Sequence, residues 1–229
     1  MPRYPFVLFD ADNTLFDFDR AEDRALRLTL SAHGLPADDA VSARYHAINA
    51  QLWAMLDRGE ATRAWLVVER FARLLAELNL PGDPEALNRA YIGRLGEGAD
   101  LLPGAEALCR KLASLCTLAI VTNGSARTQH SRLERSPLRD LIPHLFISQE
   151  VGFDKPDPRY FDAVCAALGL ADRRQAVVVG DNLGSDILGG INAGIDTVWF
   201  NPGGLPRDPA IPPTWEVRDF DALEHVLLP

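Results

Sequence analysis

Four short polar segments carry the side chains whose types and spacing point to chemistry. In chain order they are Asp10-Ala11-Asp12-Asn13-Thr14, Thr122-Asn123-Gly124, Lys155-Pro156, and Gly180-Asp181 followed by Asp186. Two neighbouring carboxylates can divide the work of a nucleophile and of a proton donor and acceptor. Carboxylate oxygens also bind a hard divalent cation, and a lysine adds a fixed positive charge. Together these residue types predict attack on an anionic phosphoryl group.

The first segment is expected to perform the covalent chemistry. We assign Asp10 as the nucleophile, because a carboxylate that attacks phosphorus divides the slow hydrolysis of a phosphate monoester into two easier steps. Asp12 is then the acid and base, which protonates the leaving oxygen and later takes a proton from the attacking water. Asp10 and Asp181, together with the backbone carbonyl of Asp12, are predicted to supply oxygen ligands for Mg²⁺.

The remaining segments are expected to bind the phosphate and to orient the site. Thr122 and Asn123 stand at the predicted start of a helix and offer a hydroxyl and backbone N–H groups to phosphate oxygens. Lys155 supplies a positive charge that can pair with Asp10 before catalysis and offset the charge of the transition state. Asp186 is predicted to orient either Lys155 or a metal-bound water.

Each polar segment is expected at the carboxyl end of a strand or in the loop that follows it. The apolar runs that predict buried strands are Phe6–Phe9, Leu118–Val121, Leu145–Ile147, Ala176–Val179 and Thr197–Phe200. Amphipathic helical stretches precede the later strands, which is typical of a doubly wound parallel sheet, an α/β fold with a Rossmann-like core. Taken alone, each polar segment is as typical of a turn or a helix cap as of a catalytic site. All four segments would meet at the carboxyl edge of the sheet, however, and ligands bind at that edge.

A long helical segment separates the first strand from the second. From about Asp19 to Leu95 the apolar periodicity predicts four helices and no strand, with Asp19 and Asp83 as N-caps. Because the first strand belongs to the same sheet as the later strands, the helical segment is an insertion. We therefore predict an α/β core over residues 1–16 and 97–229 and an all-helical cap over residues 17–96.

Composition narrows the classes of partner. The chain of 229 residues has 23 basic and 32 acidic side chains, giving a net charge of −9, and the charges are interspersed. This pattern argues against electrostatic binding to nucleic acid or to a membrane surface. The three cysteines lack C-x-x-C spacing, which favours neither a disulfide framework nor a zinc site. With no signal segment or membrane-length apolar run in the sequence, we expect a cytoplasmic protein, and the oligomeric state stays open.

The four segments together resemble the haloacid dehalogenase superfamily of hydrolases. Its phosphatases carry D-x-D-x-T, a strand-end Ser or Thr, a Lys and an acidic G-D-x-x-x-x-D loop, and all four are present in this order. The resemblance implies that Asp10 is the nucleophile and Asp12 the acid and base. It also implies Thr122 and Lys155 as phosphate binders, and Asp10, Asp12 and Asp181 as Mg²⁺ ligands. The inserted segment is similar to the helical cap of subfamily I.

Three stretches are similar to one group within that superfamily, the bacterial pyrimidine 5′-nucleotidases. These stretches are residues 9–19, 132–135 and 185–194. The resemblance implies a Mg²⁺-dependent phosphomonoesterase that acts on pyrimidine nucleoside monophosphates through an aspartyl-phosphate. A phosphatase for another small metabolite, such as phosphoglycolate or a sugar phosphate, is the alternative. A phosphomutase and a non-catalytic phospho-accepting signalling protein also stay open, whereas Asp12 and Asp181 argue against a dehalogenase, which lacks the second aspartate and needs no metal.

Overall fold

The computed structural model describes residues 2–228, and the chain divides into two compact units. The core unit comprises Met1–Phe18 and Ala99–Pro229, and the helical unit comprises Asp19–Gly98. The predicted core (1–16 and 97–229) and the predicted cap (17–96) differ from these units by two residues at each junction.

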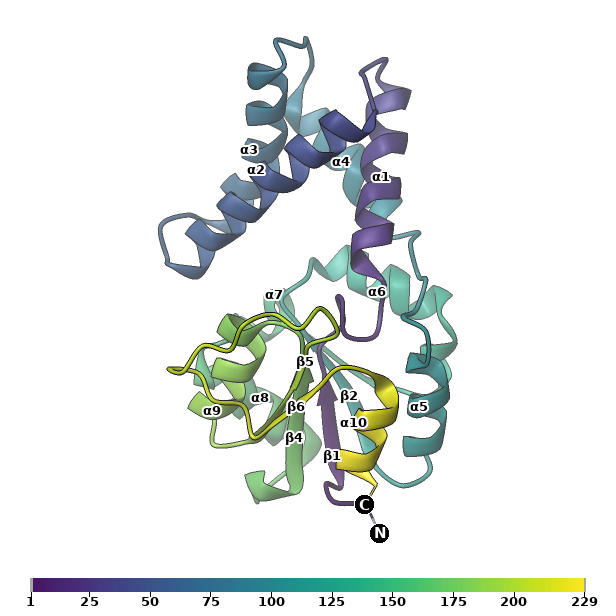
Figure 1. Ribbon diagram of the computed structural model, residues 1–229, viewed down its shortest axis with the longest axis vertical. Helices are drawn as coiled ribbons and strands as arrows, with labels where there is room; N and C mark the ends of the chain where they lie inside the picture. The colour runs from purple at the N-terminus through teal and green to yellow at the C-terminus, as the bar shows by residue number, and fades with distance from the viewer. Residues whose placement is uncertain (1, 229) are drawn as a thin grey trace. The chain divides into compact units, whose positions relative to one another are not determined.

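Within the described residues, the core unit contains one sheet of six parallel strands (Figure 1). Their order in the sheet is β3-β2-β1-β4-β5-β6. The strands are β1 (Phe6–Phe9), β2 (Thr117–Thr122), β3 (His144–Ile147), β4 (Ala176–Gly180), β5 (Asp196–Phe200) and β6 (Trp215–Val217). Because β1 pairs with β2 on one side and with β4 on the other, the loops that follow these three strands lie side by side.

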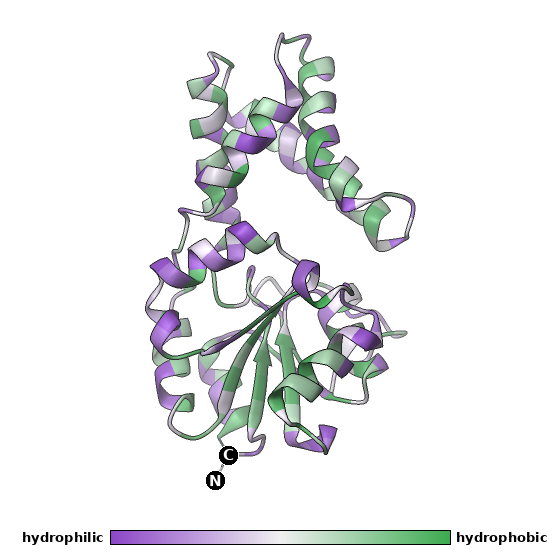
Figure 2. Cartoon of the chain, turned by 180° about the vertical axis from the view of Figure 1, so that it is seen from behind, coloured by the Kyte–Doolittle hydropathy of each residue, from purple (hydrophilic) through white to green (hydrophobic). Residues whose placement is uncertain are grey.

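Helices cover both faces of this sheet (Figure 1). The helices are α5 (Ala105–Leu112), α6 (Ala126–Arg135), α7 (Ser148–Val151), α8 (Pro158–Leu168), α9 (Leu188–Asn192) and α10 (Phe220–Leu227), with short turns η1 (Pro137–Asp140), η2 (Arg173–Gln175) and η3 (Leu183–Ile187). Val7 and Phe9 of β1 pack with α5 and α10, whereas Leu8 faces α8. The strands are accordingly apolar on both faces (Figure 2). The predicted doubly wound parallel sheet is confirmed.

One strand was not predicted from the sequence. β6 pairs with β5 at the sheet edge, where Trp215 is opposite Val198 and Val217 is opposite Phe200. It has only three residues, and Trp215 is 37% exposed. A strand this short and this open shows no apolar run, so no sequence pattern separates it from the Pro/Gly-rich loop before it.

The helical unit contains α1 (Phe18–Ala32), α2 (Asp39–Asp57), α3 (Arg63–Glu77) and α4 (Pro84–Leu95). Helix α1 begins at Phe18, the last residue of the first segment of the core unit. The rings of Tyr45, Phe71 and Tyr91 pack together in the interior of the helical unit, with centroids 5.4 to 5.9 Å apart. Asp83 caps α4 as predicted, accepting from the Glu85 N–H at 2.9 Å, but Asp19 lies inside the first turn of α1.

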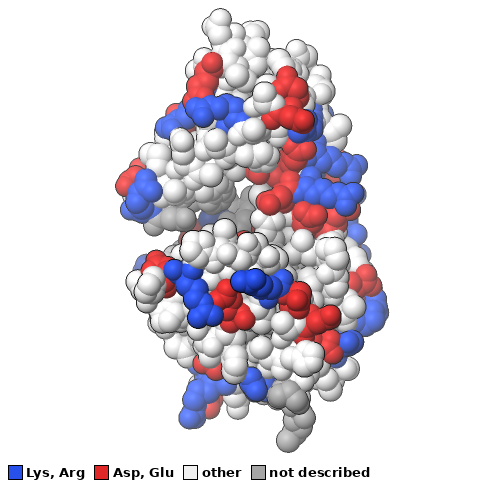
Figure 3. All heavy atoms as spheres, in the orientation of Figure 1, with Lys and Arg blue, Asp and Glu red and all other residues white. Residues whose placement is uncertain are grey.

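The described helices include none with the length and apolarity to cross a bilayer. Acidic and basic side chains are interspersed over the visible faces of both units (Figure 3).

Candidate active site

The loop after β1 turns sharply and carries Asp10 and Asp12. The Asp10 N–H still pairs with the Val179 carbonyl of β4, at 2.8 Å. The N–H groups of Leu15 and Phe16 then donate to the Ala11 carbonyl at 3.0 and 2.9 Å, which closes the loop on itself. Asn13 lies inside the loop with φ of +57°, a left-handed conformation that asparagine adopts more readily than most residues. The reversal keeps the second carboxylate beside the end of the strand.

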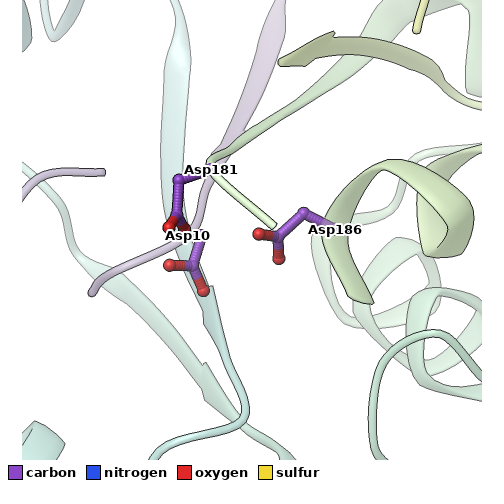
Figure 4. Close-up of side chains that lie close together, drawn as sticks. All are labelled: Asp10, Asp181 and Asp186. Atoms are coloured by element: carbon purple, nitrogen blue, oxygen red, sulfur yellow. The ribbon is translucent and has the colours of Figure 1, made fainter. Parts of the chain in front are cut away.

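Three carboxylates converge at the carboxyl edge of the sheet. Asp10 follows β1, Asp181 follows β4, and Asp186 lies in η3. One oxygen from each lies within 4.8 Å of the others, and Figure 4 shows Asp186 pointing toward the other two. The indole N–H of Trp199 donates to the Asp181 carbonyl at 2.8 Å and thereby fixes the backbone of this loop. The structure thus brings together residues that are far apart in the sequence.

Lys155 lies among these carboxylates and is 3% exposed. Its Nζ donates to Asp10 Oδ1 at 2.7 Å, to Asp186 Oδ1 at 2.6 Å and to the Val121 carbonyl at 2.6 Å. All three ammonium hydrogens therefore have acceptors, which fixes the position of the charge.

The loop that bears Lys155 is held by the side chain of Asn123. Asn123 Nδ2 donates to the Lys155 carbonyl at 2.8 Å, and Asn123 Oδ1 accepts from the Lys155 N–H at 2.9 Å. Both polar atoms of this side chain are thus engaged with the lysine backbone. The predicted role of Asn123 in phosphate binding stays a prediction, and it now rests on the backbone N–H alone.

A glycine allows Asp186 to approach the sheet. A Cβ at Gly180 would lie 2.4 Å from Asp186 Cγ, so a larger residue would displace the carboxylate. The backbone N–H of Asn182 donates to Asp186 Oδ2 at 3.1 Å while Lys155 holds Oδ1. The glycine of the Gly180-Asp181 segment therefore serves close packing at this point.

The site has more negative than positive charge. Burial raises the pKa of Asp10 to about 7, although the Lys155 ammonium acts in the opposite direction. Burial and the carboxylates of Asp10 and Asp186 raise the pKa of Asp181 to about 8. Burial lowers the pKa of Lys155, but the attraction of Asp10 and Asp186 outweighs it and the net pKa is raised. Lys155 offsets only part of the charge of three carboxylates, and their oxygens are the donors that Mg²⁺ prefers.

Thr122 ends β2 with its side chain buried and its oxygen already accepting hydrogen bonds. The Gly124 N–H donates to Thr122 Oγ1 at 3.0 Å, and Gln129 Nε2 donates to the same oxygen at 3.2 Å. With two donors on the oxygen, the hydroxyl hydrogen is the group that Thr122 can offer to a phosphate oxygen. The Gly124 N–H is thus used inside the loop.

Sequence reasoning assigned no role to two residues that contact Asp12, although one of them, Arg132, lies in a stretch similar to the pyrimidine 5′-nucleotidases. Gln129 and Arg132, both on α6, donate to the carboxylate of Asp12. Both are buried, although they are polar and charged. No pattern in the sequence identifies this role, because polar and charged residues on a helix are normally solvated.

Comparisons with known proteins agree with this geometry. The haloacid dehalogenase-like hydrolase family matches residues 4–194. A Bacillus subtilis protein named as a HAD-hydrolase, YfnB, is 39% identical over 99% of this chain and 97% of its own length. Pyrimidine 5′-nucleotidase YjjG of Escherichia coli is 37% identical over 98% of each chain. Pyrimidine 5′-nucleotidase PynA of Streptococcus pneumoniae is 34% identical over 96% of this chain and 93% of its own.

A solved structure is similar over nearly the whole chain. It is the crystal structure of YfnB from Bacillus subtilis bound to magnesium, which matches with a TM-score of 0.96 and 38% identity. The match covers 99% of this chain and 100% of that chain.

Proposed function

The chain belongs to the haloacid dehalogenase-like hydrolase family and is a phosphoric monoester hydrolase, and we propose that its substrates are pyrimidine nucleoside 5′-monophosphates. The observation that carries this proposal is the full-length similarity to two proteins named as pyrimidine 5′-nucleotidases, at 37% and 34% identity. The similarity extends through the helical unit, the segment in which we predict substrate selection.

Asp10 performs the first half of the proposed reaction. One of its oxygens attacks phosphorus, the bond between phosphorus and the ester oxygen breaks, and the nucleoside leaves as an alcohol after Asp12 gives the ester oxygen a proton. Lys155 holds Asp10 Oδ1 at 2.7 Å, which fixes the orientation of the attacking carboxylate. The same ammonium offsets negative charge as it builds up on the phosphoryl group.

Water completes the reaction. The carboxylate of Asp12 takes a proton from the water that attacks the phosphorus of the aspartyl-phosphate, and the bond from phosphorus to Asp10 breaks. Inorganic phosphate leaves and both aspartates return to their first state. One residue serves both proton transfers because the proton given to the alcohol is recovered from the water.

The proposed cofactor is Mg²⁺, and the residues present fit it. The ligands would be the carboxylates of Asp10 and Asp181 and the backbone carbonyl of Asp12, an all-oxygen set at the end of two neighbouring strands. When bound, the ion supplies positive charge to the phosphoryl oxygens and to the attacking carboxylate. Burial is the largest cause of the raised pKa values of Asp10 and Asp181, and the neighbouring carboxylates act in the same direction, so a bound cation would offset both effects.

A substrate comparison tests the proposal. Steady-state kcat/KM is measured for dUMP, dTMP, UMP, AMP and GMP, with phosphoglycolate and a hexose phosphate as controls. We expect the pyrimidine nucleotides to exceed the purine nucleotides, because a small base pocket rejects the larger ring. If a non-nucleotide phosphate is preferred tenfold, which is about 1.4 kcal/mol of transition-state stabilisation, the nucleotide proposal is wrong and the alternative of a phosphatase for a small metabolite replaces it.

A further inference from the structure

The buried face of α6 is polar where a helix of this fold normally presents apolar side chains. Its buried residues are Thr128, Gln129 and Arg132. Arg132 is 0% exposed. A charged side chain at such a position is costly unless a partner offsets its lost hydration. The partner of this arginine is the acid and base of the proposed reaction.

Both carboxylate oxygens of Asp12 are held from α6. Arg132 Nη1 donates to Asp12 Oδ1, and Gln129 Nε2 donates to Asp12 Oδ2 at 2.8 Å. The two donors are three residues apart, so they lie on one face of the helix. A carboxylate has about four acceptor positions, and two are left for a proton or for a water.

The two donors are themselves fixed. The guanidinium carbon of Arg132 lies 4.5 Å from the ring centroid of Phe16, in the closed loop after β1. Gln129 Nε2 also donates to Thr122 Oγ1 at 3.2 Å, which ties it to the end of β2. A Cβ at Gly124 would lie 2.2 Å from Gln129 Nε2, so the glycine provides the space that this side chain occupies.

We propose that Arg132 and Gln129 are positioning residues that hold the Asp12 carboxylate in the orientation from which it exchanges protons with the leaving oxygen and with the attacking water. The inference rests on the proposed phosphatase mechanism. The side chain of Asp12 is 27% exposed on a loop, so without these donors it would occupy several rotamers. A single orientation shortens the search for the proton-transfer geometry and so raises kcat. Neither donor exchanges a proton.

Two esters with different leaving groups separate this role from others. 4-Nitrophenyl phosphate expels a stable phenolate that needs no proton, whereas an alkyl ester such as dTMP expels an alkoxide that needs one. The variants are Arg132→Met and Gln129→Met, which keep side-chain volume and remove the donors. Arg132→Lys restores the charge without the planar fork. Arg135→Met is the matched control, because it places the same substitution on the exposed face of α6.

With the alkyl ester, we expect kcat of Arg132→Met to fall about 10- to 100-fold, at or below the lower end of the roughly 10²- to 10⁴-fold that acid–base catalysis contributes, because Asp12 itself stays in place. KM should change less than about twofold, and Arg132→Lys should recover part of the loss. With the aryl ester, the first release of nitrophenolate should keep its rate while the steady state slows, because breakdown of the aspartyl-phosphate still needs Asp12. A rapid burst of nitrophenolate followed by slow turnover is the signature, and Arg135→Met should behave as wild type.

A double-variant cycle gives an independent readout. If Arg132 acts through Asp12, the pair Asp12→Asn and Arg132→Met should be no slower than Asp12→Asn alone. Losses that multiply in the double variant would overturn the inference. Values of kcat within twofold of wild type for both Arg132→Met and Gln129→Met would also overturn it. Equal loss of the burst and of the steady state would also overturn it. If Arg132→Met fails to fold, Gln129→Met decides, because it deletes one donor and no charge.

The substrate proposal can fail without affecting this test. If dTMP is not hydrolysed, the alkyl ester that is best turned over in the substrate comparison takes its place. If no acid-stable phosphoenzyme forms from any ester in wild type or in Asp12→Asn, the mechanism through Asp10 is wrong, and the positioning inference falls with it.

Discussion

Two regions of the molecule bury charged side chains, and they do so differently. At the sheet edge of the core unit, the carboxylates of Asp10, Asp181 and Asp186 lie close together, and the ammonium of Lys155 pairs with Asp10 and Asp186. In the helical unit, Glu22 and Arg70 are buried within a network of amide, phenol and carbonyl groups. The first region leaves negative charge in excess, whereas the second gives each charge its own set of hydrogen bonds.

The network of the helical unit consists of Glu22, Asn49, Arg70, Asn88, Tyr91 and His46. Glu22 accepts hydrogen bonds from Asn49 Nδ2 at 2.9 Å and from the Tyr91 hydroxyl at 3.1 Å. His46 Nδ1 lies within hydrogen-bond distance of the same carboxylate, at 2.9 Å. The guanidinium of Arg70 donates to Asn88, to Asn49 and to the Val67 carbonyl, and it lies 4.6 Å from the Tyr91 ring centroid. Satisfied charges of this kind hold helices in one arrangement, whereas like charges crowded in a site indicate chemistry.

The largest effect should follow from removing the nucleophile. Asp10→Asn replaces a carboxylate by an amide, a poor nucleophile and a poor cation ligand, so kcat/KM should fall by about 10³-fold or more, roughly 4 kcal/mol of transition-state stabilisation. The free energy of unfolding should change little, because the loss of attraction to Lys155 is offset by less repulsion from the other carboxylates. Steady-state kinetics and urea unfolding measure the two effects. Residual activity of a few per cent, with deamidation excluded by mass spectrometry, would contradict the assignment.

Removal of the metal should also abolish activity, because the proposed Mg²⁺ ligands include Asp10 and Asp181. Activity should vanish after treatment with chelator and return with Mg²⁺, while Ca²⁺, which tolerates looser coordination, should restore it poorly. Mg²⁺ should also raise the melting temperature, because a ligand that binds only the folded state stabilises it. Asp181→Asn should abolish this thermal shift, and Glu22→Gln, in the other charged region, should leave it unchanged. Full turnover in excess chelator would require a different mechanism.

Variants in the charged network of the helical unit should change stability and leave the chemical step unchanged. Glu22→Ala leaves the donors of Asn49, Tyr91 and His46 without their acceptor, and we expect the free energy of unfolding to fall by about 3 kcal/mol. Glu22→Gln keeps one acceptor oxygen and should cost about half as much. The exposed Glu85→Ala is the matched control and should cost less than about 1 kcal/mol. Equal losses for Glu22 and Glu85 in urea unfolding would mean that the network contributes nothing.

Sequence reasoning predicted the core better than the network. Buried parallel strands are recorded as apolar runs, and polar residues at their ends mark the sheet edge, so β1, β2 and β4 were predicted together with the candidate site residues that follow them. The contacts of Lys155 with Asp10 and Asp186 were also predicted, because all three residues belong to polar segments expected at the same sheet edge. The three-residue strand β6 left no comparable pattern.

The partners of Asp12 show what a single sequence withholds. Gln129 and Arg132 look like surface residues of a helix, and only the fold shows that this helix turns them toward the loop after β1. The burial of Glu22 and Arg70 could not be predicted for the same reason, because a charged residue on an amphipathic helix is normally solvated. Such contacts depend on which face of a helix is covered, and that is fixed by packing between segments far apart in the chain.

The smallest expected effect is the pH dependence that His46 contributes to stability. The hydrogen bond that the His46 ring donates to the Glu22 carboxylate raises the pKa of His46, with Asp23 and Asp19 acting in the same direction and burial opposing them. A folded pKa above the unfolded value means that the contribution is fully present below about pH 6.5, the unfolded value, and is lost as the pH rises through the folded pKa. The His46 side chain is 37% exposed, so solvent screening keeps this contribution small.

The difference in unfolding free energy between wild type and His46→Gln isolates this contribution from the carboxylates of the core unit. It should be largest near pH 6 and should shrink toward pH 8, and an NMR titration of the imidazole gives the folded pKa directly. In a Glu22→Gln background the same difference should lose most of its pH dependence, because the amide cannot attract the imidazolium as the carboxylate does. A difference that grows with pH would reverse the sign and show that the ring is buried in its neutral form.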